Sequence, residues 1–193
     1  MKQIIFVSLL LAIVCLIPVS CGQSYQPKPR AYFRIQLPPK EYREFNSAGP
    51  FRFSYPVYAE IAEDCHPLAG PYWINVKFPQ FDATLHITYK PINNNLGQYL
   101  DDMHRMLSKL IPKATGIKED KLIDNEARVF GTIFYISGPG VASTCQFFLT
   151  DSLNHFLRGA LYFDVTPNND SLAPVIEFLR EDILYLGATL QWE

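Results

Sequence analysis

The hydrophobic positions divide the chain into one continuous apolar run at the N-terminus and a longer region of alternating apolar and polar residues. The run extends from Ile4 to Val19, after the basic Lys2 and before small residues on either side of Cys21. A positive charge, a short apolar stretch and a cleavage site with small residues are typical of a secretory signal peptide, whereas a membrane-spanning helix needs about 20 apolar residues. We therefore predict that residues 1–20 direct export and are then removed.

Cys21 lies in the sequence context of a lipidation site. Ser20 before it resembles the lipobox of bacterial lipoproteins, although Pro18 stands where that motif prefers leucine. In this pattern the cysteine thiol and, after cleavage, its new amine are acylated with chains such as palmitate. Two or more acyl chains hold a protein stably on a bilayer. The alternative is a secreted protein in which Cys21 is an ordinary thiol.

Prolines dominate the segment that follows Cys21. Five of them fall within residues 22–50, at positions 27, 29, 38, 39 and 50. A backbone rich in proline is extended at about 3 Å per residue and acts as a semi-rigid spacer. We therefore predict a lipidated cysteine and a Pro-rich tether over residues 21–50, of which the apolar stretch 32–37 lies against a single globular domain over residues 51–193.

From Phe51 onward, the spacing of apolar residues predicts two groups of strands, each followed by a helix. Alternation with period two and, at residues 127–137, a long apolar run predict strands over residues 51–55, 57–62, 72–78, 83–89, 127–137, 143–150, 156–165 and 189–192. Helical spacing predicts helices over residues 96–111 and 172–186. We expect Asp170 or Ser171 to cap the second helix and Pro174 to lie in its first turn.

Strands that are grouped together and joined by hairpins, with only two helices, predict an α+β fold in which an antiparallel sheet is flanked by helices. The FxFxYP motif at residues 51–56, the strands that follow it and the terminal helix resemble the Mog1/PsbP-like α/β/α sandwich. This resemblance implies a fold and no function.

Composition and charge exclude several classes of protein. Aromatic residues make up 14% of the chain and charged residues only 19%, which excludes a disordered protein. The formal net charge of -2 leaves no basic surplus to bind phosphate backbones, so we expect no nucleic-acid partner.

Cys65 and Cys145 are the two thiols that remain after Cys21. In an oxidising envelope a disulfide between them would contribute roughly 4 kcal/mol, because it closes a loop of about 80 residues. The alternative is two separate free thiols, of which at least one is buried. The sequence leaves both alternatives open.

Other candidate residues give weak signals for catalysis or metal binding. The histidines at positions 66, 86, 104 and 155 lack metal-ligand spacing, and we expect no metal or other cofactor. Asp151, Ser152 and His155 have the residue types of a hydrolase triad, but the GxSxG turn is absent and the first two are common turn formers. We therefore do not expect an enzyme.

Two surface features have alternative interpretations. The triplets DSL at 151–153 and DSL at 170–172 resemble the sites that Bacteroidetes O-glycosylate, which makes Ser152 and Ser171 candidates for this modification. Glu177, Arg180 and residues 181–182 are predicted to lie on the exposed side of the last helix. That face is either solvated or a docking surface for a partner.

Five stretches together resemble the GldD family of gliding-motility lipoproteins of Bacteroidetes. They are PKPRAYFRIQLPPKEY (27–42), FRFSYPVYAEI (51–61), YWINVKFPQFDATLHITYK (72–90), QFFLTDSLNHFLRGALYF (146–163) and SLAPVIEFLREDILYL (171–186). The resemblance implies a non-enzymatic envelope lipoprotein that is required for gliding and linked to the type IX secretion machinery. Only Cys21 carries over as a functional residue.

The expected role is thus protein–protein interaction with other gliding and type IX secretion proteins, from a membrane to which the chain is held by its lipid. Gly22, in place of the aspartate that retains many lipoproteins at the inner membrane, favours the outer membrane, with the domain facing the periplasm. Two alternatives stay open. They are a periplasmic hydrolase that uses the loop 151–155 and a carrier of a small apolar ligand inside the sandwich.

Overall fold

The computed structural model describes residues 35–46, 48–165 and 168–193, which belong to one compact unit. The predicted signal peptide, the lipidated Cys21 and the first part of the tether lie outside the described residues. Within the described part of the chain, no helix is long and apolar enough to cross a membrane.

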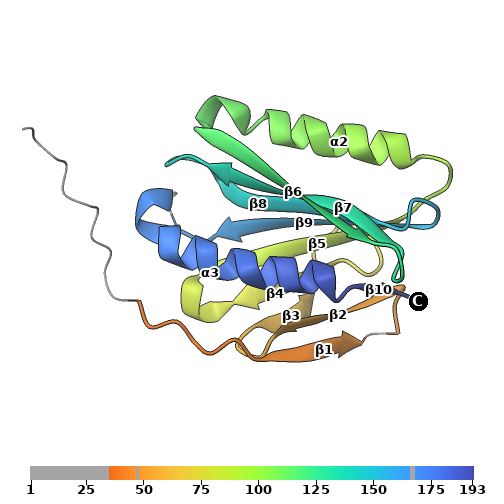
Figure 1. Cartoon of the computed structure of the whole chain (residues 1–193), viewed down its shortest axis with the longest axis horizontal. Helices are drawn as coiled ribbons and strands as arrows, with labels where there is room; N and C mark the ends of the chain where they lie inside the picture. Colours follow the sequence, from red (N-terminus) through yellow and green to blue (C-terminus); the bar gives the residue numbers. More distant parts are fainter. Residues whose placement is uncertain (1–34, 47, 166–167) are drawn as a thin grey trace, which may run out of the picture. The chain divides into compact units, whose positions relative to one another are not determined.

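The described strands form two antiparallel sheets (Figure 1). One has three strands in the order β1-β2-β10, and the other has seven in the order β3-β4-β5-β9-β8-β7-β6. The strands are β1 (Tyr42–Asn46), β2 (Phe51–Pro56), β3 (Glu60–Glu63), β4 (Ile74–Phe78), β5 (Ala83–Pro91), β6 (Gly116–Asp124), β7 (Val129–Ser137), β8 (Ser143–Thr150), β9 (His155–Phe163) and β10 (Gln191–Trp192). The helices are α2 (Leu96–Ser108) and α3 (Asn169–Ala188), with short 3₁₀ turns η1 (Pro79–Phe81) and η2 (Ile111–Lys113). The predicted α+β class is confirmed.

Two apolar cores lie on opposite faces of the seven-stranded sheet (Figure 1). The larger core joins this sheet to α3 and to the three-stranded sheet, and Phe147 and Leu161 are at its centre with at most 1% exposure. The smaller core joins Met103 and Leu107 of α2 to β7 and β8. The sheet is therefore covered on both faces where β7 and β8 lie.

Strand β7 shows why its sequence is a continuous apolar run. Ile133 and Tyr135 point into the larger core, whereas Phe134 and Ile136 point into the smaller one. Because successive side chains of a strand face opposite sides, a strand that is buried on both faces has no polar alternation.

Two strands were not predicted, and both lie at sheet edges. Strand β1 falls inside the predicted tether and pairs with β2 alone, so the domain begins before the predicted residue 51. Strand β6 carries the charged residues Lys118 to Lys121 and pairs with β7 alone. An edge strand with solvent around most of its side chains needs no apolar face, so hydrophobic periodicity does not detect it.

The start of α3 differs from the predicted one. The helix begins at Asn169, its N-cap is Asn168, and no side chain caps it, so neither Asp170 nor Ser171 has the predicted role. Pro174 accordingly lies in the second turn. The Asn169 side chain instead donates hydrogen bonds to the carbonyl oxygens of Gly138 (2.7 Å) and Val141 (2.8 Å), which fixes the helix start to the β7–β8 connection.

Candidate functional site

The hairpin loop between β8 and β9 is organised around Asp151. Its Oδ1 atom accepts hydrogen bonds from the backbone N–H groups of Leu153 (3.0 Å), Asn154 (2.8 Å) and His155 (2.8 Å). The Nδ1 atom of His155 lies 2.9 Å from the Tyr89 hydroxyl, and the His155 ring stacks on the ring of Trp192 in β10. The contacts of Asp151 and His155 are thus those of a hairpin turn and not of a Ser–His–Asp relay.

The same hydrogen bonds predict a pH dependence of stability. Burial acts to raise the pKa of Asp151, but the three backbone N–H donors and the nearby His155 outweigh it and lower the pKa below its ordinary value. A carboxyl with a lower pKa in the folded state stabilises that state above its unfolded pKa of about 4, and this contribution is lost as the pH falls through the folded pKa. Asp151→Asn is therefore expected to reduce the free energy of unfolding at pH 6, and to do so by less and less below pH 4.

Urea unfolding of both proteins across this pH range measures the difference. Ser152→Ala is the matched control, because it removes no titrating group. It should change the free energy of unfolding by the same amount at every pH. A gap between Asp151→Asn and the wild type that stays constant from pH 6 to pH 2.5 would show that the ionised carboxylate contributes nothing.

The two cysteines of the domain are free thiols in different environments. Cys145 lies on β8, opposite Leu161, and is 0% exposed in the larger core, whereas Cys65 is exposed in the loop after β3. Burial raises the pKa of the Cys145 thiol to about 12. The sequence left open either a disulfide or two separate thiols. The structure has two separate thiols, because Cys145 in the core does not contact Cys65 in the loop.

A thiol count tests this arrangement. With Cys21 acylated, we expect Ellman's reagent to modify one thiol per folded chain, at Cys65, and a second only in denaturant, because the thiolate that reacts is absent from a buried thiol of raised pKa. A chain with no reactive thiol in denaturant until a reductant is added would instead contain the disulfide.

The remaining candidates lie apart from one another. Ser152 and Ser171 are both exposed, so each hydroxyl is accessible to a modifying enzyme, and their glycosylation stays a prediction. In the residues that the structure describes, no three His, Cys, Asp or Glu side chains lie close enough together to hold a metal ion.

Asp182 is the most buried charged group that the structure describes, and the prediction that it faces solvent is wrong. Its side chain is 1% exposed, and Oδ1 lies 2.6 Å from the Lys40 ammonium and accepts a hydrogen bond from the Tyr42 hydroxyl at 2.9 Å. The Tyr58 hydroxyl donates to Oδ2. A buried carboxylate is tolerated when it is paired and hydrogen-bonded, as it is here.

Lys40 makes three more contacts with α3, and one of them is an ion pair with the exposed Glu181 at 3.7 Å. Its ammonium donates to the Phe178 carbonyl oxygen at 2.6 Å and lies 3.5 Å from the centre of the Phe178 ring. Beside it, the Tyr42 ring stacks on Tyr185 with centroids 3.9 Å apart. We call Lys40, Tyr42, Tyr58, Phe178 and Asp182 the Asp182 cluster.

The Asp182 cluster is built to hold protons in place and not to exchange them. Burial, together with the hydrogen bond to Asp182 and its negative charge, raises the pKa of both Tyr42 and Tyr58 well above the ordinary value. Both hydroxyls therefore remain donors at neutral pH, and the cluster fixes residues 40–42, in the second half of the predicted tether, to α3.

The sequence contained a signal for this cluster that hydropathy alone did not reveal. Asp182 lies three residues after Leu179 and four before Leu186, which is the spacing of the apolar stripe of α3. An acidic residue at a core position requires partners, and the lysine and two tyrosines of residues 40–58 supply them.

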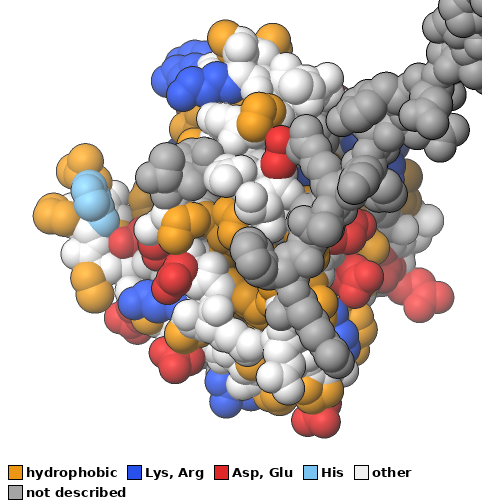
Figure 2. Space-filling view, turned by 90° about the vertical axis from the view of Figure 1, so that its left-hand side faces the viewer, with side chains coloured by type: hydrophobic (Ala, Val, Ile, Leu, Met, Phe, Trp, Pro, Cys, Tyr) orange, Lys and Arg blue, Asp and Glu red, His pale blue; other side chains and the backbone are white. Residues whose placement is uncertain are grey.

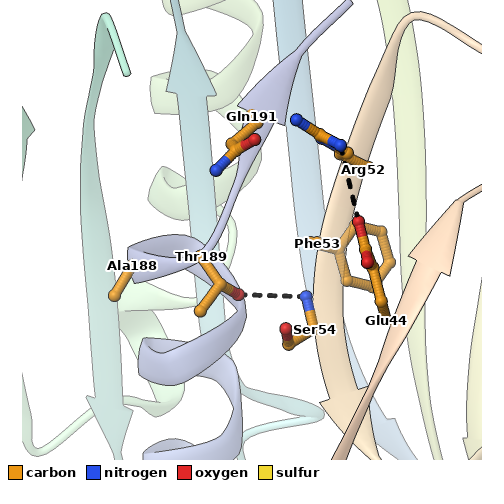
Figure 3. A pocket seen from close by; sticks show the side chains of 7 residues that line it. All are labelled: Glu44, Arg52, Phe53, Ser54, Ala188, Thr189 and Gln191. Carbon is orange, nitrogen blue, oxygen red and sulfur yellow. Dashed lines mark hydrogen bonds and ion pairs between the residues drawn. The ribbon is translucent and has the colours of Figure 1, made fainter. Parts of the chain in front are cut away.

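Among the hollows on the surface of the described domain, two have volumes above 400 Å³. The first has a volume of about 440 Å³ and lies where β10 leaves the edge of β2 (Figure 3). There the Ser54 N–H donates to Thr189 Oγ1 at 3.0 Å, and the Arg52 guanidinium lies 3.7 Å from Glu44 and 3.3 Å from Glu193. The polar groups at this site are thus mostly paired with one another.

The second hollow is larger and more apolar, and we call it the aromatic hollow. It measures about 590 Å³ and lies between the end of β1 and the strands β3 and β4. Its lining consists of Phe45, Ala48, Ile61, Glu63, Asp64, Gly70, Pro71, Tyr72, Trp73 and Ile74.

Elsewhere the surface is mixed in character. The face at which the described chain and α3 both begin shows hydrophobic and acidic side chains intermixed, with basic side chains in separate small groups (Figure 2).

Comparisons with known proteins give a family match and a structural likeness. The family model for the gliding motility lipoprotein GldD matches residues 22–192. No curated protein matches the chain by sequence. The structure is similar to the solution structure of cyanobacterial PsbP (CyanoP) from Synechocystis sp. PCC 6803, with a TM-score of 0.47 and 8% identity, over 83% of this chain and 98% of that chain. That likeness concerns the fold alone.

Proposed function

The chain belongs to the GldD family of gliding motility lipoproteins, and from this premise we propose that it acts by binding other proteins of the gliding and type IX secretion machinery. Membership of the family makes it an envelope lipoprotein held by a lipid anchor. The proposal adds the placement of that anchor in the outer membrane, with the domain facing the periplasm.

The observation that carries this proposal is the extent of the family match. It begins at residue 22, directly after the cysteine of the lipobox, and ends at residue 192, so it includes the tether and the whole domain. The Asp182 cluster supports the same function, because it ties residues 40–42 to the longest helix. The domain therefore holds its N-terminal segment in place from residue 40 onward.

Crosslinking in the native organism tests the proposal. Envelopes that contain the wild-type chain or Cys21→Ala are treated with a crosslinker, and the chain is recovered with whatever is joined to it. We expect gliding or type IX secretion components with the wild type and their loss with Cys21→Ala, because the variant cannot be acylated. Recovery of none of them, while the wild-type chain is at the membrane, would refute the proposal.

Ser152→Ala is the matched variant for the hydrolase alternative. It changes one exposed hydroxyl and leaves the hydrogen bonds of Asp151 in place. Gliding is expected to continue unchanged. Loss of gliding with an unchanged amount of protein would replace the binding function with catalysis at this loop.

A further inference from the structure

The aromatic hollow lies near a rigid group of aromatic rings. The Trp73 indole N–H donates to the Tyr89 carbonyl oxygen at 2.9 Å, and the Tyr72 ring meets the Tyr89 ring edge-on with centroids 5.9 Å apart. Tyr89 in turn contacts His155, which stacks on Trp192 near the C-terminus. One wall of the hollow is therefore anchored to the larger core and to the end of the chain.

Tyr72 has a backbone conformation that its side chain disfavours. Its φ angle is 64°, and its side chain is 47% exposed even though it is large and aromatic. A bulky residue in the left-handed region is strained, and such residues cluster at ligand-binding sites. The strain places an aromatic face at the rim of the hollow, where it is available to a ligand.

The charged residues that line the hollow are all acidic. Of the described residues that line it, two are acidic and none is basic. Asp64 accepts a hydrogen bond from the His66 backbone N–H at 2.9 Å, and Glu63 has no ion pair within the described part of the chain. An apolar hollow with an unpaired carboxylate at its rim complements a large apolar side chain that is close to a positive charge.

The hollow also borders an open sheet edge. Strand β3 contributes Ile61 and Glu63 to the lining and pairs only with β4, so its other edge has no strand partner among the described residues. An extended peptide can add its backbone to such an edge while its alternate side chains enter pockets beside it.

We propose that the aromatic hollow binds an extended peptide segment of a partner protein, in which a lysine or arginine lies two positions from a large apolar side chain, so that both face the hollow. The apolar side chain enters between Phe45 and Trp73, the basic one meets Glu63, and the peptide backbone runs along β3. This inference rests on the proposed function, since it assigns the surface through which the chain binds its partner.

Site-specific photo-crosslinking in the living host tests the inference. A photoreactive phenylalanine, p-benzoylphenylalanine, replaces Tyr72 in the full-length chain, and the same residue replaces Ile123 on β6 as the control, because Ile123 is 66% exposed and lies on the opposite edge strand of the sheet. We expect a crosslinked protein from position 72 only. Mass spectrometry should place the crosslink within two residues of a lysine or arginine in the partner.

Charge reversal supplies the second readout. Glu63→Lys is expected to reduce the crosslink from position 72 at least about fivefold, whereas Glu119→Lys on β6 leaves it unchanged. Both glutamates are exposed, so neither substitution should alter the thermal unfolding of the chain.

The outcomes separate this inference from the proposed function. Loss of the crosslink with Glu63→Lys, at a mapped apolar-basic segment, supports the inference. An unaffected crosslink, a crosslink to a second copy of the chain or to a non-protein molecule, or no crosslink from position 72 overturns it. If the wild-type pull-down still recovers secretion components in those cases, the binding function stands and only the assigned surface is wrong.

Discussion

Asp182→Ala is expected to lower the free energy of unfolding by about 3 kcal/mol. The substitution removes a carboxylate that is 1% exposed and leaves the Lys40 ammonium, itself only 25% exposed, with the more distant and exposed Glu181, at 3.7 Å, as its ion-pair partner on α3. It also leaves the Tyr42 and Tyr58 hydroxyls with no acceptor at this position. Breaking a buried pair by removing one partner costs more than the pair contributes, because the remaining groups stay desolvated.

Urea unfolding followed by tryptophan fluorescence measures this loss, because both tryptophans of the chain, Trp73 and Trp192, lie in the domain. Glu177→Ala is the matched control, since this residue is also acidic and on α3 but its side chain is 71% exposed and, among the described residues, forms an ion pair with Arg180 alone. Its expected effect is at most about 0.5 kcal/mol. Equal effects of the two substitutions would show that the Asp182 cluster contributes no more than a surface ion pair.

The Asp182 variant also has an expected structural consequence. Because the cluster joins residues 40–42 to α3, amide hydrogens of β1 should exchange faster in Asp182→Ala, while those of β8 and β9 keep their protection. Faster exchange across all strands would mean that the cluster stabilises the domain as a whole and not its N-terminal segment.

Gly131→Ala is the second substitution with a large expected effect, again about 3 kcal/mol of unfolding free energy. A Cβ atom at this position of β7 would lie 2.0 Å from the Phe148 carbonyl oxygen and 2.8 Å from Leu149 Cδ2. The first contact is with the backbone of the neighbouring strand, so it cannot be relieved by a side-chain rotation. Strand β8 would have to move away, at the expense of its hydrogen bonds with β7.

Gly116→Ala on β6 is the control for this prediction, because a Cβ atom there has nothing within 4 Å. It also pairs with β7, so the two variants place the same methyl group in the same sheet. Thermal unfolding should show a lower midpoint for Gly131→Ala and no loss for Gly116→Ala. A Gly131→Ala protein as stable as the wild type would show that β7 and β8 can separate locally without penalty.

Periodic apolar residues were sufficient to predict the interior of the fold. The strands from β7 to β9, the hairpin that joins β8 to β9 and the two helices follow from alternation, turn residues and helical spacing. The edge strands β1 and β6 were not predicted, because each pairs on one side only and keeps charged side chains in solvent. Their strand conformation is stabilised by a neighbour that is distant in the sequence.

The sequence by itself determined the α+β class, the export and lipidation motifs and the family, because each depends on residues that are adjacent or regularly spaced. Only the tertiary structure decided that Asp182 is buried against Lys40, that Cys145 and Cys65 are separate, and that Tyr72 faces an acidic, aromatic hollow. These features arise where segments more than a hundred residues apart, such as residues 40 and 182, or loops between strands, come into contact. The position of Asp182 on the apolar stripe of α3 indicates that it is buried, but its partners depend on such contacts, which local sequence patterns do not encode.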